Sequence, residues 1–173
     1  GEPRYQKPPL PTWLSAGSAL LFGVKSVFAM RIPAAIITIV LILISYTFTK
    51  KLTGNNRYAF ISSLILATSF FIVFSGRNGQ WDIFTHGFMM AAIYQFYLFF
   101  STPEKKYQRI LLAALFFGCS FMSKGPVSLY ALLLPFLIAY GFVFKFKKGT
   151  KSVLPILLFF IVALLVSGWW HLY

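Results

Sequence analysis

The sequence predicts an all-α protein that crosses a membrane several times. Of its 173 residues, 58% are hydrophobic and only 11% are charged, whereas soluble domains carry about 25% charged residues. The mean hydropathy is +0.76, and the basic residues occur as short clusters between long apolar runs, which is typical of polytopic membrane proteins. This pattern excludes a soluble enzyme and a disordered chain, and it excludes a nucleic-acid-binding module despite the net charge of +13.

The first 31 residues are predicted to form a unit of their own, ahead of a transmembrane domain of residues 32–173. Four prolines between positions 3 and 11 favour an extended loop at its start. From Leu10 to Phe28 the apolar residues then recur with a helical period, interrupted by Gly17 and Gly23. We expect one or two helices that lie along the outer membrane surface rather than a membrane span.

Five segments have the length and low charge of membrane-spanning helices: residues 32–49, 58–75, 81–100, 127–144 and 152–170. Eighteen helical residues rise about 27 Å, close to a hydrocarbon core of roughly 30 Å. A sixth segment, residues 110–122, rises only about 20 Å. This segment is predicted to cross only where the bilayer is thin or where its end lies in a protein-lined cavity.

The loops between these segments predict the orientation. Residues 50–57, 101–109 and 145–151 together hold ten of the sixteen Lys and Arg residues. If the six segments alternate in direction, these three loops share one side, which the positive-inside rule makes cytoplasmic. The alternation requires segment 110–122 to cross the membrane. Residues 76–80 and 123–126 then lie on the outer side.

Asp82 is the acidic residue with the strongest indication of a function. It lies at the outer end of the third predicted span, where an ionisable side chain is costly and is usually paired or functional. Glu104 lies in a basic loop and Glu2 near the start of the chain. Alternatively, Asp82 caps its helix and pairs with Arg77, and spacing alone favours neither interpretation. His86 shares a helix face with Asp82, and a packed interface histidine is its favoured interpretation.

Basic residues are predicted on the same outer face as Asp82: Lys7, Arg31, Arg77 and Lys124. Because phosphate groups are bound by Lys and Arg, they are candidate ligands of a phosphate. Lys124 stands in the tight turn Ser123-Lys124-Gly125-Pro126. A lysine that only reaches toward the membrane surface is less expected there, since positive charge is disfavoured on this side. The sequence contains no metal-ligand spacing, glycine-rich phosphate loop or nucleophile elbow.

The order of several short motifs identifies a family. These motifs are Lys7-Pro8-Pro9-Leu10, Trp13-Leu14, Leu21-Phe22-Gly23, Arg31-Ile32-Pro33-Ala34, Ala67-Thr68-Ser69, Arg77 five residues before Asp82, and Lys124-Gly125-Pro126. Each is weak alone, but their order and spacing cover most of the chain. In this order the chain resembles the bacterial polyprenyl-phosphate-sugar-dependent glycosyltransferases, which include protein O-mannosyltransferases and the aminoarabinose transferase that modifies lipid A.

The resemblance implies a GT-C-type helical membrane fold in the bacterial inner membrane, with the active site facing the periplasm or the cell exterior. It implies that a sugar passes from a polyprenyl-phosphate donor to a lipid, glycan or protein acceptor, with inversion of the anomeric centre. Asp82 resembles the second acidic position of the family, which His86 would support. Lys7 and Lys124 resemble contacts to the donor phosphate, and Arg31 and Arg77 are further candidates for it.

The resemblance also limits what this stretch is expected to do alone. The first catalytic acid of the family lies in an outer loop upstream of Lys7, so we expect residues 1–173 by themselves to be inactive. Many relatives carry Glu where this chain has Gln6, and the cofactor stays open, with a divalent metal of the complete enzyme as one candidate. No nucleic-acid partner is expected.

Two other functions are compatible with the sequence. A coupled transporter places ionisable residues near the membrane centre, yet four of the predicted spans contain no charged residue at all. A lipid-binding subunit without catalytic activity is the second alternative, because Asp82 is the only acidic residue predicted at the outer membrane boundary.

Overall fold

A computed structural model of the chain describes residues 8–102, 104–144 and 153–168. In these ranges the regular structure is helical and contains no strand, which confirms the predicted all-α class. The helices are α1 Leu10–Phe22, α2 Val27–Thr53, α3 Asn56–Thr68, α4 Phe70–Asn78, α5 Trp81–Ser101, α6 Lys106–Lys124, α7 Leu134–Phe144 and α8 Val153–Ser167. A π-helical stretch, Leu129–Leu133, leads directly into α7.

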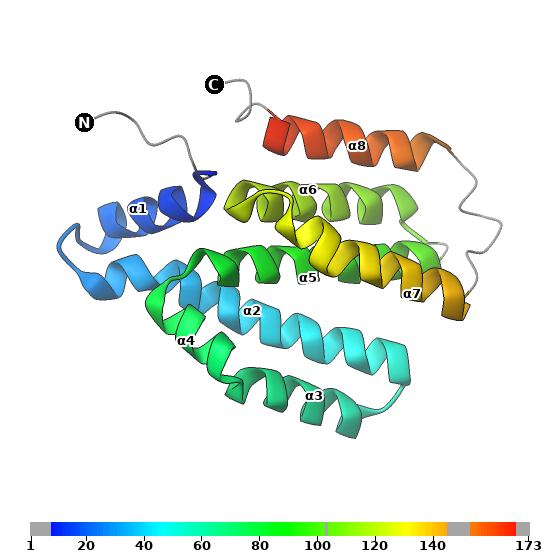
Figure 1. Ribbon diagram of the computed structural model, residues 1–173, viewed down its shortest axis with the longest axis horizontal. Helices are drawn as coiled ribbons and strands as arrows, with labels where there is room; N and C mark the ends of the chain where they lie inside the picture. The colour runs from blue at the N-terminus through cyan, green and yellow to red at the C-terminus, as the bar shows by residue number, and fades with distance from the viewer. Residues whose placement is uncertain (1–7, 103, 145–152, 169–173) are drawn as a thin grey trace.

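The helices form a bundle in which α5 occupies the centre (Figure 1). Helix α5 packs against α6 on one side and α2 on the other, and α6 also packs against α8. In the most apolar window of α5, 67% of the residues are buried inside the protein, compared with 17% for α2. Helix α2 is therefore largely exposed in the described part of the chain, whereas α5 is enclosed by the other helices.

The ends of the helices gather at two ends of the bundle. At one end lie the α2–α3 corner, the α5–α6 junction and the adjoining ends of α7 and α8 (Figure 1). The start of α2, the α4–α5 junction and the end of α6 lie at the opposite end (Figure 1). The alternation of direction assumed for the predicted topology is therefore present in the described helices.

Two described helices are long and apolar enough to cross a bilayer by themselves. They are α2 with 27 residues and α5 with 21 residues, and they contain the segments 32–49 and 81–100 that the sequence predicts to span the membrane. Helix α2 begins at Val27, so Arg31 lies inside the helix rather than at its head. Ser26 starts α2 by accepting a hydrogen bond from the Ala29 amide at 3.2 Å.

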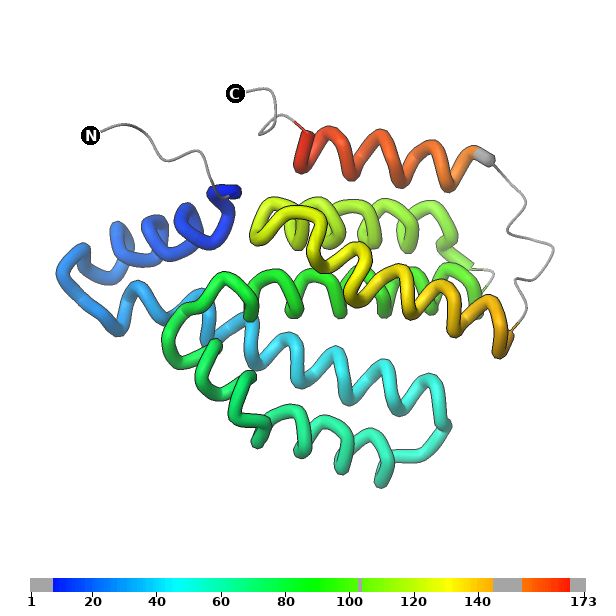
Figure 2. The backbone as a smooth tube through the Cα atoms, viewed as in Figure 1, coloured from blue at the N-terminus to red at the C-terminus, as the bar shows by residue number. Residues whose placement is uncertain are grey.

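The prediction of one continuous span over residues 58–75 is wrong in shape. Taken together, helices α3 and α4 are long and apolar enough to form one candidate span, but they are bent by 57° where they meet. Figure 2 shows this break in the tube. Ser69 leaves the helical conformation with φ −61° and ψ 127°. Just before it, the Thr68 hydroxyl donates to the carbonyl of Leu64 at 2.9 Å, a bond of the kind that bends helices.

The predicted segment 110–122 is also corrected, because α6 has 19 helical residues. At 1.5 Å per residue it rises about 28 Å, so the expected shortness was wrong. The helix also includes the basic residues Lys106 and Arg109, which were left out of the predicted segment because it was chosen as an uninterrupted apolar run. The Arg109 guanidinium donates to Gln95 Oε1 at 3.2 Å, which ties this extension to α5.

The remaining predicted segments are found as shorter helices. Helix α7 has 11 residues after its π-helical start, and α8 has 15 residues. Residues 152, 169 and 170 of segment 152–170 lie outside the described residues. Before α2 there is one helix, α1, which ends at Gly23 with φ +117°. It is joined to α2 by a 2.6 Å hydrogen bond from the Ser18 hydroxyl to the Ala29 carbonyl. Its orientation along the membrane surface stays a prediction.

Candidate functional site

The first turn of α5 meets the last turn of α6 at the candidate site. Asp82 is the acidic residue in the first turn of α5, and Lys124 is the last residue of α6. Their side chains form an ion pair, Lys124 Nζ with Asp82 Oδ1, although 42 residues separate them in sequence. The Lys124 side chain is 44% exposed and the Asp82 side chain 26%, so the pair borders the surface and an external ligand can reach it.

Two glycines place these charges at the helix ends. Gly79, with φ +64°, ends α4 and lets α5 begin two residues later. Gly125, with φ +75°, ends α6 and donates its amide to the Phe121 carbonyl at 2.7 Å. An anion in the first turn of a helix and a cation in the last turn are each stabilised by the helix dipole. Both members of the pair therefore lie where the backbone favours their charge.

The structure corrects the alternative in which Asp82 caps its helix and pairs with Arg77. The N-cap of α5 is Gln80, and Asp82 lies inside the first turn. Arg77 is an exposed residue in the last turn of α4, and it forms no ion pair with Asp82 in the described part of the chain. The partner of Asp82 is Lys124 instead.

His86 lies one turn further along α5 and packs between two neighbours. Its Nδ1 atom is 2.5 Å from the backbone carbonyl of Asp82. Its ring meets Phe71 of α4 edge-on, with the ring centroids 5.8 Å apart. This carbonyl contact and the aromatic neighbour fix the imidazole beside the ion pair without a hydrogen bond to the Asp82 carboxylate.

Neither Arg31 nor Arg77 joins this ion pair in the described part of the chain. Arg31 is exposed on α2, near the start of that helix. The start of α2 lies at the same end of the bundle as the α4–α5 junction and the end of α6 (Figure 1). Lys7 lies outside the described residues.

A buried cluster of hydroxyl groups next to the ion pair was missed by sequence reasoning. The Ser120 hydroxyl of α6 donates to the Thr85 carbonyl of α5 at 2.9 Å. It also lies 2.8 Å from the Ser128 hydroxyl, just before the π-helical stretch. Ser120 has no exposed surface and Ser128 is 2% exposed. These contacts fix the end of α6, and with it Lys124, against the start of α5. In the sequence, the only indication of these contacts is the presence of small polar residues such as Ser120.

Replacing Ser120 with Ala is expected to destabilise the complete protein by about 1 kcal/mol, since it removes hydrogen bonds between helices in a water-free environment. Ser123 is a matched control, because it is equally buried but donates only to Cys119 of its own helix, at 2.8 Å. Thermal unfolding in detergent should show a clearly larger loss for Ser120→Ala than for Ser123→Ala. Equal losses would mean that the contact between the helices adds no stability.

Within residues 8–102, 104–144 and 153–168, no three His, Cys, Asp or Glu side chains lie close enough to hold a metal ion. Asp82 and His86 supply two such residues at most. The described residues do not form a metal site by themselves, and the chemistry considered below uses only side chains of this chain.

The ion pair has the groups needed to bind an anion beside a hydroxyl. A lysine ammonium has three N–H donors, so Lys124 can serve Asp82 and a phosphate oxygen together. A carboxylate accepts several hydrogen bonds, so Asp82 can also hold a hydroxyl group. The site can therefore place a phosphate ester next to an acceptor alcohol.

Comparisons with known proteins bear on the family and the fold of the chain. The family described as dolichyl-phosphate-mannose-protein mannosyltransferase matches residues 6–170. A protein of Aquifex aeolicus is 27% identical over all of this chain and 34% of its own length. The undecaprenyl phosphate-alpha-4-amino-4-deoxy-L-arabinose arabinosyl transferase 1 of Proteus mirabilis is 29% identical over 83% of this chain and 26% of its own length.

The fold has a solved counterpart. The crystal structure of ArnT from Cupriavidus metallidurans in the apo state matches 96% of this chain with a TM-score of 0.79 and 21% sequence identity, over 31% of the ArnT chain. This match confirms the predicted multi-pass helical membrane fold of the GT-C type. The chain spans about a quarter to a third of the length of these relatives. Because the family match extends over nearly the whole sequence, the chain belongs to the dolichyl-phosphate-mannose-protein mannosyltransferase family.

Proposed function

We propose that the complete protein is a membrane glycosyltransferase that moves a sugar from a polyprenyl-phosphate carrier to a lipid, glycan or protein acceptor. Family membership supports this activity, and so do the names of relatives that transfer aminoarabinose from undecaprenyl phosphate. A transporter is not favoured by these relatives. The single observation that carries the placement of the site is the ion pair between Lys124 and Asp82.

The proposed reaction forms a bond from the acceptor oxygen to the anomeric carbon and breaks the bond from that carbon to the phosphate oxygen. The departing polyprenyl phosphate gains negative charge, which a preorganised cation such as Lys124 stabilises. The acceptor hydroxyl loses its proton, and a nearby carboxylate assists this loss. Asp82 is the described residue placed to do so, and His86 supports its position through the carbonyl contact.

Further phosphate ligands are proposed around this pair. Arg31 and Arg77 are both exposed. Arg31 lies near the start of α2 and Arg77 in the last turn of α4, and these two helix ends lie at the same end of the bundle (Figure 1). Lys7 is a candidate from the motif in which it stands. We propose that these cations bind the donor phosphate together with Lys124, and that this end faces the periplasm or cell exterior from the bacterial inner membrane.

The role of Lys124 is tested by replacing it with Gln in the complete protein. We expect the KM for an undecaprenyl-phosphate-linked aminoarabinose donor to rise on the order of tenfold, because a hydrogen bond to a charged group is worth about 1.5–3 kcal/mol. Initial rates measured against donor concentration give this value. Lys25→Gln is the control, since Lys25 is an exposed lysine in the turn before α2. An unchanged KM in Lys124→Gln would remove Lys124 from the donor site.

The proposed orientation predicts the side from which single cysteines react. In a variant of the complete protein with Cys119 replaced by Ser, a cysteine at position 78 should react with a membrane-impermeant maleimide added outside intact spheroplasts. A cysteine at position 55, in the α2–α3 corner, should react only after the membrane is opened. The reverse pattern would place the ion pair on the cytoplasmic side and overturn the proposed site.

A further inference from the structure

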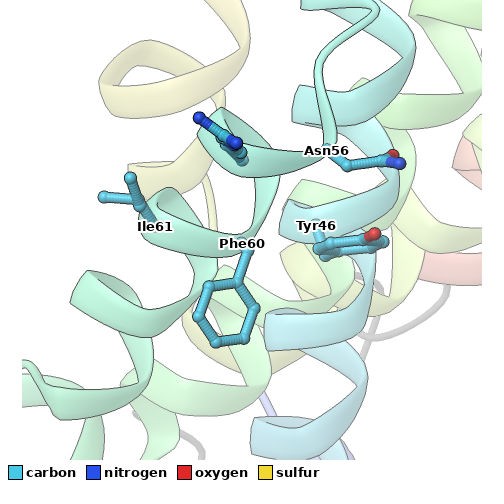
Figure 3. Close-up of a pocket in the computed structure, with 5 residues that line it drawn as sticks. Tyr46, Asn56, Phe60 and Ile61 are labelled. Atoms are coloured by element: carbon cyan, nitrogen blue, oxygen red, sulfur yellow. The ribbon is translucent and has the colours of Figure 1, made fainter.

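A second surface feature lies at the end of the bundle opposite to the ion pair. It is a hollow of about 390 Å³ between the end of α2 and the start of α3, lined by Tyr46, Asn56, Arg57, Phe60 and Ile61 (Figure 3). It is an open depression on the surface rather than an enclosed cavity. Nothing in the proposed sugar transfer uses it.

The hollow has one basic lining residue, Arg57, next to exposed apolar side chains, and Lys50 lies outside this lining. Arg57 is exposed at the start of α3, and Lys50 is exposed on α2, four residues after Tyr46 and on the same helix face. Phe60 and Ile61 lie about one turn deeper along α3 and are 60% and 52% exposed. Residues 46–61 contain three basic residues and no acidic one, so this α2–α3 corner carries a net positive charge.

Local hydrogen bonds hold the walls of the hollow in place. Gly54, with φ +69°, closes α2 by donating to the Lys50 carbonyl at 2.9 Å. The Asn55 side chain caps α3 by accepting from the Arg57 amide at 2.8 Å. The Tyr97 hydroxyl of α5 donates to the Lys51 carbonyl at 3.3 Å, so the corner is also tied to the central helix. The hollow is preformed, which lowers the entropy lost when a ligand binds.

We propose that this α2–α3 hollow binds an anionic phospholipid through its phosphate headgroup. Arg57 and Lys50 meet the phosphate, for which the fork of the guanidinium is well suited, and the start of the acyl chain covers Phe60 and Ile61. The exposure of these two residues favours a lipid over free phosphate, because inorganic phosphate would leave both apolar side chains uncovered. With the orientation proposed above, the hollow lies on the cytoplasmic side, where basic pockets between transmembrane helices are a recurrent form of anionic-lipid site. The lipid proposal rests on that proposed orientation and not on the proposed sugar transfer.

The test is native mass spectrometry of the complete protein in a neutral detergent with short-chain phosphatidylglycerol added. We expect more bound phosphatidylglycerol than phosphatidylcholine, and about a fivefold loss of the former in Arg57→Gln, from roughly 1 kcal/mol per basic residue. Arg57→Lys should retain most of the binding. Lys106→Gln is the matched control, since it removes one positive charge at the same end of the bundle but outside the hollow.

Two further measurements identify the ligand. Phe60→Ala should weaken phosphatidylglycerol binding, and millimolar inorganic phosphate should not displace the lipid. Equal loss of lipid in Arg57→Gln and Lys106→Gln would overturn the proposal, because the attraction would then be diffuse. Displacement by inorganic phosphate together with no effect of Phe60→Ala would also overturn it, because the hollow would then be a simple anion site.

Discussion

Replacing Asp82 with Asn in the complete protein is expected to lower the rate of sugar transfer roughly 100-fold or more while the unfolding temperature stays unchanged. Asn keeps the size of the side chain but removes the charge, and loss of one acid–base or electrostatic group has an effect of this order. The effect on stability is expected to be small, because a partly exposed ion pair contributes about 0–1 kcal/mol, and the Asp82–Lys124 pair is 26% and 44% exposed.

Transfer kinetics and thermal unfolding of the same preparations check this expectation. Glu104→Gln is the matched control, since it also neutralises one exposed carboxylate, at the other end of the bundle. If Asp82→Asn turns over at nearly the normal rate and only Asp82→Ala is less stable, Asp82 is a structural residue of the α5 start and the proposed site loses its catalytic group.

The second large effect is expected at the contact between α6 and α8. A Cβ atom added at Gly118 would lie 2.6 Å from Val166 Cγ1 and 2.7 Å from Val166 Cβ, closer than real carbon atoms approach. Gly118→Ala should therefore destabilise the protein by about 1–3 kcal/mol, the usual range for an overfilled contact. Gly118→Val should separate the two helices and prevent the protein from folding normally. Thermal unfolding in detergent and the yield of folded protein measure both effects.

A compensating change and a control make this prediction specific. Val166→Ala should restore part of the stability lost in Gly118→Ala, because it removes Cγ1, one of the two Val166 atoms that the new methyl group meets, while the Val166 Cβ position stays occupied. Gly17→Ala in α1 should be neutral or slightly stabilising, since a Cβ there meets nothing within 4 Å. If the stability losses of Gly118→Ala and Val166→Ala simply add in the double variant, the two residues do not limit each other's size and the prediction is contradicted.

The parts of the fold that the sequence predicted are those set by local composition. The apolar runs of α2 and α5 have the length of a bilayer and contain few charges, so hydropathy locates them. The break at Ser69 lies inside a continuous apolar run, so hydropathy does not detect it, and the bond from the Thr68 hydroxyl to the Leu64 carbonyl accompanies it. The extension of α6 through Arg109 depends on Gln95 of another helix, which no local pattern shows.

The candidate site was likewise predicted only in part from the sequence. The sequence placed Asp82 and Lys124 on one membrane face, because topology follows from span length and loop charge. It could not choose between Arg77, five residues from Asp82, and Lys124, 42 residues away, because that choice depends on how α5 and α6 pack. The hydrogen bond between Ser120 and Thr85 could not be predicted from the sequence either. A serine in an apolar helix can bond to the backbone of its own helix instead, as Ser123 does.

The central position of α5 has a consequence for how the protein is assembled during synthesis. Helix α2 is the more apolar of the two span candidates, so it is expected to enter the lipid from the translocon more readily than α5. Helix α5 is less apolar and carries Asp82, His86 and Gln95, which make insertion of a lone helix unfavourable. Its retention in the bilayer therefore depends on neighbours made before and after it, α2 and α6, and biogenesis is cooperative around the helix that carries the candidate carboxylate.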